Sequence, residues 1–409
     1  MILYEQQAHR LKVLRKLLDR SSCRKRARRA KSLRTTAILR KDLELSTFLP
    51  RLLRTVALAL ACACVLTAAS ARAARDDTLY AAAIREGRVI VHAATDERIA
   101  RPLIRDFEQR YPGVRVHYED LNSGELYRRF LDEAARGEQA DVVWSSAMDM
   151  QVKLVNDGYA QPWRSAETAA LPDWAVWKNE AFGTTFEPVA IAYNRKRLAP
   201  ADVPTTHAEL LRLLAQQPER FRGKLATYEP STSGLGFMLH TQDELANPVV
   251  FWKLAQAFGR TGIATLVSTT GMLDRIASGE ALIGYNVLGS YALLRAHEDP
   301  AIGVVLPRDY TLVLSRIAFI SRGARHPNAA RLWLDHLLSR EGQQLLAQNP
   351  GFFAVRDDVP DDAAAAELRR QLGGAFRPIP IGPGLMTYLD QVKRRDFLRK
   401  WQQTLFPAP

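Results

Sequence analysis

The stretch ADVVWSSAMDMQVKLVNDG, residues 140–158, has the pattern of a buried strand that leads directly into a helix. Ala140–Trp144 is an apolar run of strand length, and Ser145 and Ser146 follow it at once. Apolar residues then recur at helical spacing over Met148–Asn156, until Gly158 ends the helix. Such strand–helix units with short connections are the building blocks of a parallel sheet covered by helices.

Two similar units precede this one along the chain. The predicted strands are Arg88–Ala93 and Val114–Tyr118, and the predicted helices are Glu97–Tyr111 and Glu125–Arg136. The turn Asn122-Ser123-Gly124 connects the second strand to its helix. Three successive units of this kind predict an α/β lobe.

The residues that follow predict a second lobe and a return to the first. The 336 residues from 74 to 409 exceed the size at which one hydrophobic core keeps growing. We assign residues 74–188 to lobe 1, 189–309 to lobe 2, and 310–409 to the return and the C-terminal helices. Tyr310–Ser321 is long and apolar enough for one strand that passes back through lobe 1. Two crossovers of this kind form a hinge that lets the lobes close on a ligand at the strand ends.

Helices are predicted in both later segments. In lobe 2 they cover residues 206–216, 249–258 and 271–278, among strands at 189–194, 224–227, 281–285 and 302–306. In the last segment they cover residues 328–338, 340–348 and 390–403. The final helix is charged but carries Phe397, Leu398 and Trp401 on one side, so we expect it to dock against a lobe.

The basic character of the chain is confined to its first part. The formal net charge is +13, but residues 1–73 contain 17 of the 57 Lys and Arg and only 4 of the 44 Asp and Glu. The remainder is therefore near neutral. A high isoelectric point usually suggests nucleic-acid binding. Here the excess lies outside the expected folded part, so we expect no nucleic-acid partner.

Cysteine is confined to the same first part. Cys23, Cys62 and Cys64 all precede residue 74, and the rest of the chain has none. A cysteine-free domain excludes a cysteine nucleophile and cysteine-based metal sites, and it is compatible with an oxidising compartment. Cys62 and Cys64 also lack a leucine three positions upstream, which disfavours a lipoprotein anchor.

Residues 1–73 have the features of an export leader with a signal peptide. Arg51 and Arg54 flank the start of an apolar run, Thr55–Ala69, and small residues then predict cleavage after Ala71 or Ala73. The run is shorter than the ~20 residues of a permanent membrane-spanning helix. We therefore expect a periplasmic protein. Residues 1–50 are long and basic for such a leader, so they are either the product of a start codon assigned too early or a real extension, which we expect to be disordered or loosely helical.

The order of motifs along residues 80–405 resembles one family. These motifs are VIVHAATDE, DLNSGELYRRF, ADVVWSSAMDMQVKLVNDGYA, WKNEAFGTTFEPVAIAYN, GKLATYEPSTSGLGF, SGEALIGYNVLGSYA and HPNAARLWLDHLLSREGQQLLA. Together they are similar to the ferric-iron and organophosphate branch of the solute-binding proteins of ABC importers, which have the type II periplasmic-binding-protein fold. The resemblance implies a monomeric receptor that closes on a small ligand and delivers it to a permease and an ATPase. It implies no chemistry on the ligand and no cofactor.

The resemblance also implies where a metal would bind in the iron-binding members. Those proteins use a histidine after the first strand, a glutamate after the third, and two adjacent tyrosines in the second lobe. The corresponding positions here are Thr95-Asp96, Ser146 and Tyr285-Asn286. Hydroxyl and amide groups suit an oxyanion better than Fe³⁺. The expected ligand is therefore an anion such as a sugar phosphate or phosphonate. Ferric iron held by Tyr285 is the alternative.

Serine-rich turns are the candidate anion-binding groups. The turn ending in Ser233-Gly234 lies between a strand and a helix, where free backbone N–H groups and the helix dipole favour an anion. Ser145, Ser146 and Ser123 lie at equivalent strand ends. Ordinary helix capping explains each of these residues equally simply.

Three further residues complete the candidate ligand site. Tyr285 and Asn286 end a predicted strand of lobe 2. Tyr285 could contact the ligand, or it could simply be an aromatic residue packed in the hydrophobic core. Arg316 interrupts an apolar strand, so it either meets an internal carboxylate, which we favour, or points into the cleft and binds phosphate bidentately. Thr95 ends the first strand.

The two other functional classes to consider are an enzyme and a ligand-sensing subunit. The chain has no serine nucleophile elbow, P-loop or HExxH motif, so nothing indicates an enzyme. A ligand-sensing subunit for a membrane histidine kinase would use the same two-lobed receptor, and the sequence does not separate sensing from transport.

Overall fold

The computed structural model describes residues 77–348, 352–359, 368, 370 and 372–406. The leader with its signal peptide lies outside these residues. The chain divides into two units, Met1–Asp77 and Thr78–Pro409, and the description below concerns the second. None of its described helices is long and apolar enough to cross a membrane.

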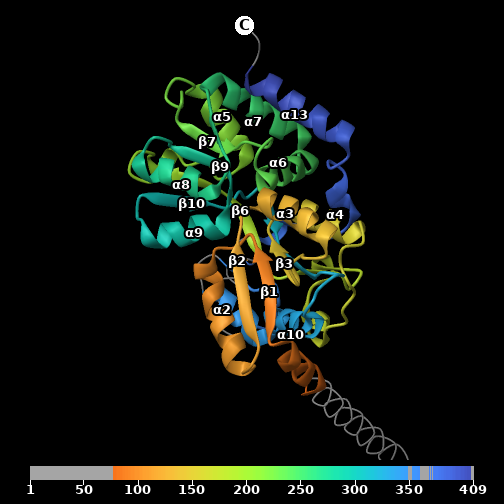
Figure 1. The fold of residues 1–409 in the computed structure, drawn as a ribbon. Helices are drawn as coiled ribbons and strands as arrows, with labels where there is room; N and C mark the ends of the chain where they lie inside the picture. Colours follow the sequence, from red (N-terminus) through yellow and green to blue (C-terminus); the bar gives the residue numbers. More distant parts are fainter. Residues whose placement is uncertain (1–76, 349–351, 360–367, 369, 371, 407–409) are drawn as a thin grey trace, which may run out of the picture. The chain divides into compact units, whose positions relative to one another are not determined.

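Two mixed sheets covered by helices form two lobes, as the strand–helix pattern predicts (Figure 1). The first sheet has the order β2-β1-β3-β12-β5-β4. Its strands are β1 (Arg88–Ala93), β2 (Arg115–Asp120), β3 (Val142–Ser145), β4 (Val176–Trp177), β5 (Ala181–Gly183) and β12 (Ile317–Ile320). The helices of this lobe are α2 (Glu97–Arg110), α3 (Ser123–Arg136), α4 (Met148–Asn156), α10 (Pro327–Leu338) and α11 (Arg340–Ala347).

The second sheet has the order β13-β11-β6-β9-β7-β8, and β10 pairs with β6. Its strands are β6 (Glu187–Asn194), β7 (Leu225–Tyr228), β8 (Ala264–Leu266), β9 (Ile283–Leu288), β10 (Ile302–Val305), β11 (Thr311–Leu314) and β13 (Phe376–Pro378). The helices of this lobe are α5 (His207–Gln216), α6 (Gly234–Ala246), α7 (Pro248–Thr261), α8 (Thr269–Ser278), α9 (Gly289–Glu298) and α13 (Gln391–Leu405).

The chain passes between the lobes at two adjacent points and crosses a third time between α11 and β13, so the hinge has one crossing more than the two predicted. It leaves the first sheet after β5 and enters the second at β6, and it returns between β11 and β12. The prediction of one strand over Tyr310–Ser321 is therefore wrong. Between the two strands, the backbone of Arg316 bonds to the other crossing segment instead. Thr184 N donates to Arg316 O (2.9 Å), and Arg316 N donates to the hydroxyl of Thr185 (2.9 Å).

The approach of the two crossing segments requires a glycine. A Cβ added to Gly183 would lie 2.7 Å from Ser315 Oγ, which is closer than real contacts allow. Ser315 Oγ in turn accepts a hydrogen bond from Thr185 N (3.1 Å). The hinge is therefore a pair of segments held together by hydrogen bonds.

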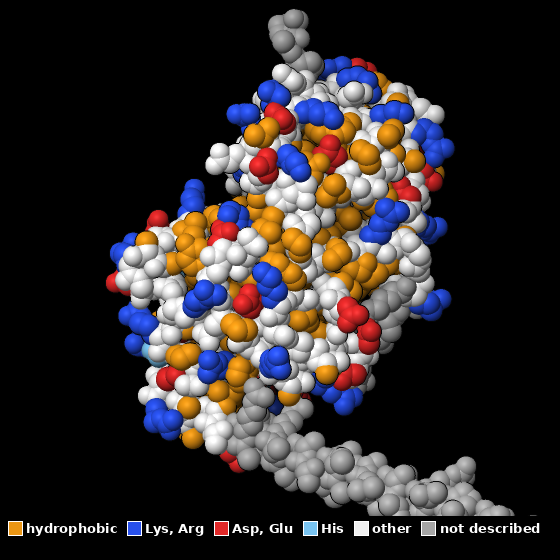
Figure 2. Space-filling model, turned by 90° about the vertical axis from the view of Figure 1, so that its right-hand side faces the viewer, with side chains coloured by type: hydrophobic (Ala, Val, Ile, Leu, Met, Phe, Trp, Pro, Cys, Tyr) orange, Lys and Arg blue, Asp and Glu red, His pale blue; other side chains and the backbone are white. Residues whose placement is uncertain are grey.

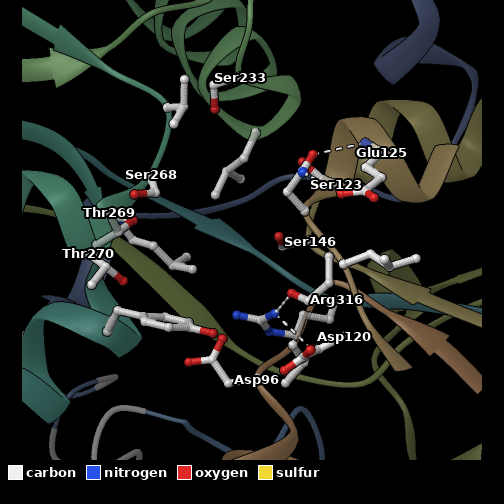
Figure 3. Close-up of a pocket in the computed structure, with 18 of the residues that line it drawn as sticks. Asp96, Asp120, Ser123, Glu125, Ser146, Ser233, Ser268, Thr269, Thr270 and Arg316 are labelled. Carbon is white, nitrogen blue, oxygen red and sulfur yellow. Dashed lines mark hydrogen bonds between the residues drawn. The ribbon is translucent and has the colours of Figure 1, made fainter. Parts of the chain in front are cut away.

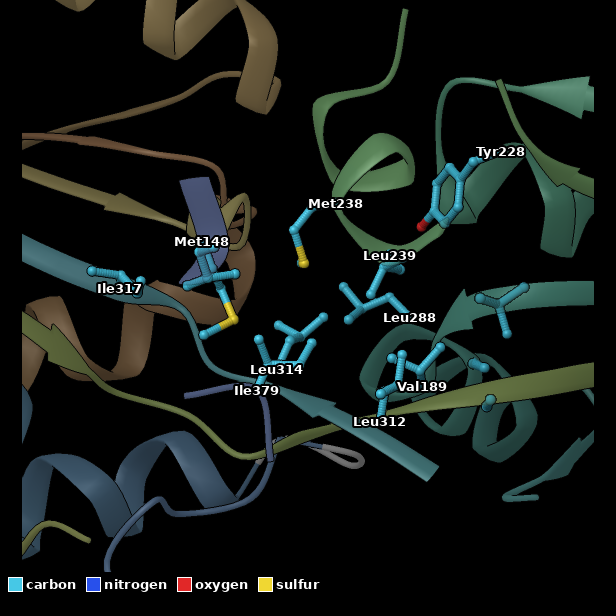
Figure 4. Close-up of a cluster of buried hydrophobic side chains, with 14 of the residues drawn as sticks. Met148, Val189, Tyr228, Met238, Leu239, Leu288, Leu312, Leu314, Ile317 and Ile379 are labelled. Carbon is cyan, nitrogen blue, oxygen red and sulfur yellow. The ribbon is translucent and has the colours of Figure 1, made fainter. Parts of the chain in front are cut away.

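One hydrophobic cluster continues through the hinge from lobe to lobe. Figure 4 shows Met148 and Ile317 of lobe 1 near Leu314, which ends β11, and Ile379, which follows β13 of the second sheet. Such contiguous packing ties the two lobes to a common base, because buried apolar area is lost if the segments separate.

The last part of the chain is shared between the lobes. Helices α10 and α11 cover lobe 1, whereas β13 pairs with β11 in the second sheet. The charged helix α13 docks on lobe 2, where Phe397, Trp401 and Leu405 pack into the same cluster as Phe251 of α7. The docking face predicted for the last helix is confirmed, and its partner is lobe 2.

The face drawn in Figure 2 carries basic and acidic side chains interspersed, with hydrophobic side chains gathered across its middle. This mixture agrees with the near-neutral composition of residues 74–409. Interspersed charges of both signs on this face differ from the clustered basic residues of a nucleic-acid interface.

Asp149 in α4 makes the stability of the fold depend on pH. Burial raises the pKa of Asp149 to about 7, although the Met150 N–H and the charge of Arg394 oppose the shift. The carboxyl therefore binds its proton more tightly in the folded state than in the unfolded state. The contribution of this carboxyl to stability is greatest below the unfolded pKa of 3.8 and is lost as the pH rises through about 7.

The variant Asp149→Asn should therefore stabilise the protein at pH 8 more than at pH 5, with a difference on the order of 2 kcal/mol. Urea unfolding of both proteins at the two pH values measures it. Equal effects at pH 5 and pH 8 would show that Asp149 stays ionised in the folded protein.

Candidate functional site

A cavity of about 430 Å³ lies between the two lobes (Figure 3). Lobe 1 contributes Ala94, Thr95, Asp96, Asp120, Leu121, Asn122, Ser123, Glu125 and Ser146. Lobe 2 contributes Tyr228, Ser233, Leu235, Val267, Ser268, Thr269, Thr270, Leu288 and Tyr291, and Arg316 enters from the hinge. This volume is within the range of small-molecule sites.

Six helices begin at this cavity. Their N-cap residues, or the residue just before the N-cap in α4, line it: Asp96 for α2, Asn122 for α3, Ser146 before α4, Ser233 for α6, Ser268 for α8 and Leu288 for α9. The first turn of a helix presents free N–H groups and a partial positive charge. Their convergence favours a negatively charged ligand.

Only some of these helix ends are capped by their own side chains. Ser233 Oγ accepts from Gly236 N (3.1 Å), and Ser268 Oγ accepts from Gly271 N (3.2 Å). The N-cap residues of α2, α4 and α9 make no side-chain capping bond. Other carboxylates occupy donors at two of these ends, because Asp120 accepts from Glu97 N (3.1 Å) in α2 and Asp149 accepts from Met150 N (2.9 Å) in α4.

Ser146 points its hydroxyl into the cavity (Figure 3). Its exposed fraction is only 4%, and no described residue forms a hydrogen bond with this hydroxyl. A buried polar group normally has a partner. The unsatisfied hydroxyl of Ser146 therefore indicates a position where a ligand atom or water belongs.

Arg316 is fixed at the base of the cavity by Glu187. Its Nε lies 2.8 Å from Glu187 Oε1 and its Nη2 lies 3.2 Å from Oε2. Its Nη1 donates to Ala94 O (2.6 Å) and to the hydroxyl of Thr95 (2.8 Å). These bonds use four of its five N–H donors. The fifth, on Nη2, has no hydrogen bond to a described residue.

The ion pair keeps this guanidinium charged. Burial is the largest single influence and opposes the charge, but Glu187 together with Tyr291 and Tyr118 raises the pKa of Arg316 above its ordinary high value. Burial also raises the pKa of Tyr228 and of Tyr291. Both phenols therefore line the cavity in their neutral, hydrogen-bonding form at pH 7.

The sequence model of the family described as bacterial extracellular solute-binding protein matches residues 89–352. The chain belongs to this family. A relative of known structure, the substrate-binding protein of an ABC transporter from Agrobacterium tumefaciens, is 38% identical and has a TM-score of 0.73. The match covers 78% of this chain and 94% of that one. It confirms the predicted type II fold and makes this chain a solute-binding protein of an ABC transporter, not an enzyme.

Two more distant similarities concern phosphorylated ligands. The phosphoglycerate transport regulatory protein PgtC of Salmonella typhimurium is 28% identical over 181 residues, which are 41% of this chain and 44% of that protein. The periplasmic binding protein AfuA of Actinobacillus pleuropneumoniae, with fructose 6-phosphate bound, is 19% identical with a TM-score of 0.62. That match covers 79% of this chain and 99% of AfuA, and it shows likeness of fold.

Five predicted site residues of this solute-binding protein are brought together at the cavity. They are Thr95, Ser123, Ser146, Ser233 and Arg316. Arg316 combines both roles considered for it, because the guanidinium that lines the cavity is also paired with an internal carboxylate.

Ser145 and Gly234 lie beside the cavity rather than in its lining. Ser145 belongs to β3, and its hydroxyl accepts from Ala147 N (3.2 Å) just before α4. Gly234 lies where the lobes touch, since a Cβ there would be 2.8 Å from Met150 Cε and 3.3 Å from Ser123 Oγ. The absent side chain lets α6 approach lobe 1.

Tyr285 and Asn286 do not face the cavity, in contrast to the prediction. Both are buried inside lobe 2, where Asp243 accepts hydrogen bonds from the Tyr285 hydroxyl and from Asn286 Nδ2 (3.1 Å). The hydroxyl of Tyr310 also donates to Asp243 (2.5 Å). The tyrosine oxygen is therefore committed to an internal carboxylate, and the core-aromatic interpretation of Tyr285 agrees with the structure.

Sequence reasoning missed part of the lining. Asp120 and Glu125 of lobe 1, Tyr228 and Tyr291 of lobe 2, and Ser268-Thr269-Thr270 were not predicted. The last three had a detectable signal, because a hydroxyl-rich turn joins β8 to α8 just as the turn at Ser233 joins β7 to α6.

Proposed function

We propose that this protein captures a small ligand with an oxyanion group, such as a phosphate ester or phosphonate, between its lobes and delivers it to a permease. The observation that carries the proposal is the convergence of six helix N-termini on one cavity that also contains Arg316. Helix N-termini and a guanidinium both donate hydrogen bonds to phosphate oxygens and carry positive charge. The names of PgtC and of the AfuA complex support a phosphorylated ligand.

Ferric iron is less well supported. Among the described residues, no group of three or more His, Cys, Asp or Glu side chains is arranged to hold a metal ion. Tyr285, which would supply the phenolate, is bonded to Asp243. Burial also raises the pKa of Tyr285 well above its ordinary value, which disfavours the anionic form that Fe³⁺ needs.

A sensing role is the second candidate. The PgtC protein is named a transport regulatory protein, and a two-lobed receptor serves sensing and transport equally well. In either role we propose a periplasmic location reached through the leader at residues 1–73. The family itself is extracellular.

The variant Ser233→Asp tests the anion site. An aspartate still caps α6, so the fold should persist. Its charge should weaken binding of an oxyanion ligand by roughly 100-fold or more, because like charges in contact cost several kcal/mol. Titration calorimetry with inorganic phosphate, fructose 6-phosphate, 3-phosphoglycerate and ferric citrate identifies the ligand and measures this loss.

Thr232→Asp is the matched control, since Thr232 lies on the same turn but is exposed and outside the cavity lining. It should leave affinity within a few-fold of the parent protein. Undiminished phosphate-ester binding by Ser233→Asp would remove this helix end from the site. Binding of ferric citrate alone would overturn the oxyanion proposal.

A further inference from the structure

The charges of the cavity lining do not match a purely anionic ligand. Three carboxylates line it, from Asp96, Asp120 and Glu125, all in lobe 1. Among the described lining residues Arg316 is the one cation, and its charge is already paired with Glu187. The side chains around the ligand are therefore net negative.

These carboxylates retain free acceptor capacity. Asp120 accepts one hydrogen bond, from Glu97 N (3.1 Å), and Glu125 accepts one from Asn122 Nδ2 (2.9 Å). The described residues give the carboxylate of Asp96 no hydrogen bond, and none of the three forms an ion pair with a described residue. Helix capping accounts for one oxygen each of Asp120 and Glu125 and leaves the others open.

All three carboxylates lie on lobe 1, whereas lobe 2 lines the cavity with hydroxyl groups and no carboxylate. Ser233, Ser268, Thr269 and Thr270 belong to lobe 2, and Figure 3 shows them across the same space from Asp96, Asp120 and Glu125. The 4%-exposed hydroxyl of Ser146 points into that space without a partner, which independently marks it as the position of a ligand.

We infer that the ligand is a zwitterion, with an oxyanion held at the hydroxyl side of lobe 2 and an ammonium group held by Asp96 and Asp120, whose side chains meet at the start of α2. This inference rests on the proposed oxyanion function. A dianion alone would be repelled by the three carboxylates, whereas an ammonium on the same molecule turns that repulsion into attraction. The volume of about 430 Å³ leaves room for an organic chain between the two charged ends, beside the apolar side chains of Leu121 and Leu235.

Two matched pairs of ligands test the inference by titration calorimetry: 2-aminoethylphosphonate against ethylphosphonate, and phosphoethanolamine against ethyl phosphate. Fructose 6-phosphate, which has hydroxyl groups and no amine, is a further ligand for comparison. We expect at least one amine to bind 10-fold or more tightly than its amine-free partner and than fructose 6-phosphate. We also expect this preference to weaken with added salt.

Neutralising the carboxylates should reverse the preference. Asp96→Asn and Asp120→Asn should each weaken the amine about 5- to 10-fold and strengthen its amine-free partner. Asp132→Asn, an exposed position on α3 outside the cavity lining, is the control and should change neither affinity.

The two possible failures are distinguishable. Equal affinity within each pair, or tighter binding of fructose 6-phosphate, would overturn the zwitterion while leaving the oxyanion function intact. Failure of every phosphate and phosphonate to bind would overturn the oxyanion function, and the zwitterion with it.

Discussion

Replacing Glu187 with leucine should lower the free energy of unfolding by about 3–5 kcal/mol, because the change leaves the guanidinium of Arg316 buried without its counter-charge. The exposed fractions of the two side chains are 1% for Arg316 and 0% for Glu187. Glu187 also accepts hydrogen bonds from the hydroxyls of Thr185 (2.7 Å) and Ser290. Urea unfolding monitored by tryptophan fluorescence measures the loss.

The double variant Glu187→Leu with Arg316→Met separates the ion pair from the packing. Removing both charges should recover most of the lost stability, since a buried pair contributes little beyond two apolar residues of similar volume. Ligand affinity should not recover, because the N–H donors of Arg316 are gone. A double variant as unstable as Glu187→Leu would show that the hydroxyls bonded to Glu187, rather than the charge, decide the effect.

An exposed ion pair serves as the reference for the buried pair. Glu219 Oε1 and Arg222 Nη2 lie 2.5 Å apart, and the exposed fractions of the two side chains are 75% and 63%. Glu219→Leu should change the free energy of unfolding far less than Glu187→Leu does, because solvent screens an exposed pair. The contrast with Glu187→Leu would follow from the burial of Glu187 and from the two hydroxyls that donate to it.

The second large effect is expected at Trp401, whose replacement by alanine should cost about 3–5 kcal/mol of unfolding free energy. The exposed fraction of this indole is 1%, and its ring stacks on His240 at 4.5 Å and lies 6.0 Å from the ring of Phe251. These contacts attach α13 to lobe 2. Thermal unfolding followed by circular dichroism measures the change.

Phe406→Ala is the control for Trp401, since Phe406 follows α13 directly but is 51% exposed. It should cost less than about 0.5 kcal/mol. A small effect at Trp401 would mean that α13 contributes little to lobe 2, and the docking of this helix would then need another explanation.

Local pattern predicted the elements that build the sheets. The strand Arg88–Ala93 and the helix Met148–Asn156 have the bounds that their apolar periodicity indicates. The first helix ends one residue earlier than predicted, at Arg110. Strands β4, β5, β8 and β13 were missed, because two or three residues are too few to show a period.

Part of the site was also readable from local signals. Ser123 and Ser233 lie between a strand and a helix, and that order alone places them at the edge of the sheet where ligands bind. Tyr285 has the same kind of local signal, yet it faces the interior of lobe 2. Its direction depends on Asp243, which lies 42 positions earlier and binds its hydroxyl.

The sequence by itself determined the two-lobed α/β architecture and the turns that open each helix, since both depend on residues within one or two turns of chain. Only the tertiary structure decided how Arg316 is used. Its carboxylate partner Glu187 is 129 positions away, and the guanidinium meets it because two crossing segments lie side by side in the hinge. The negative side of the cavity was hidden for the same reason. Asp96, Asp120 and Glu125 have ordinary local surroundings, and folding alone brings them to the lining of one cavity.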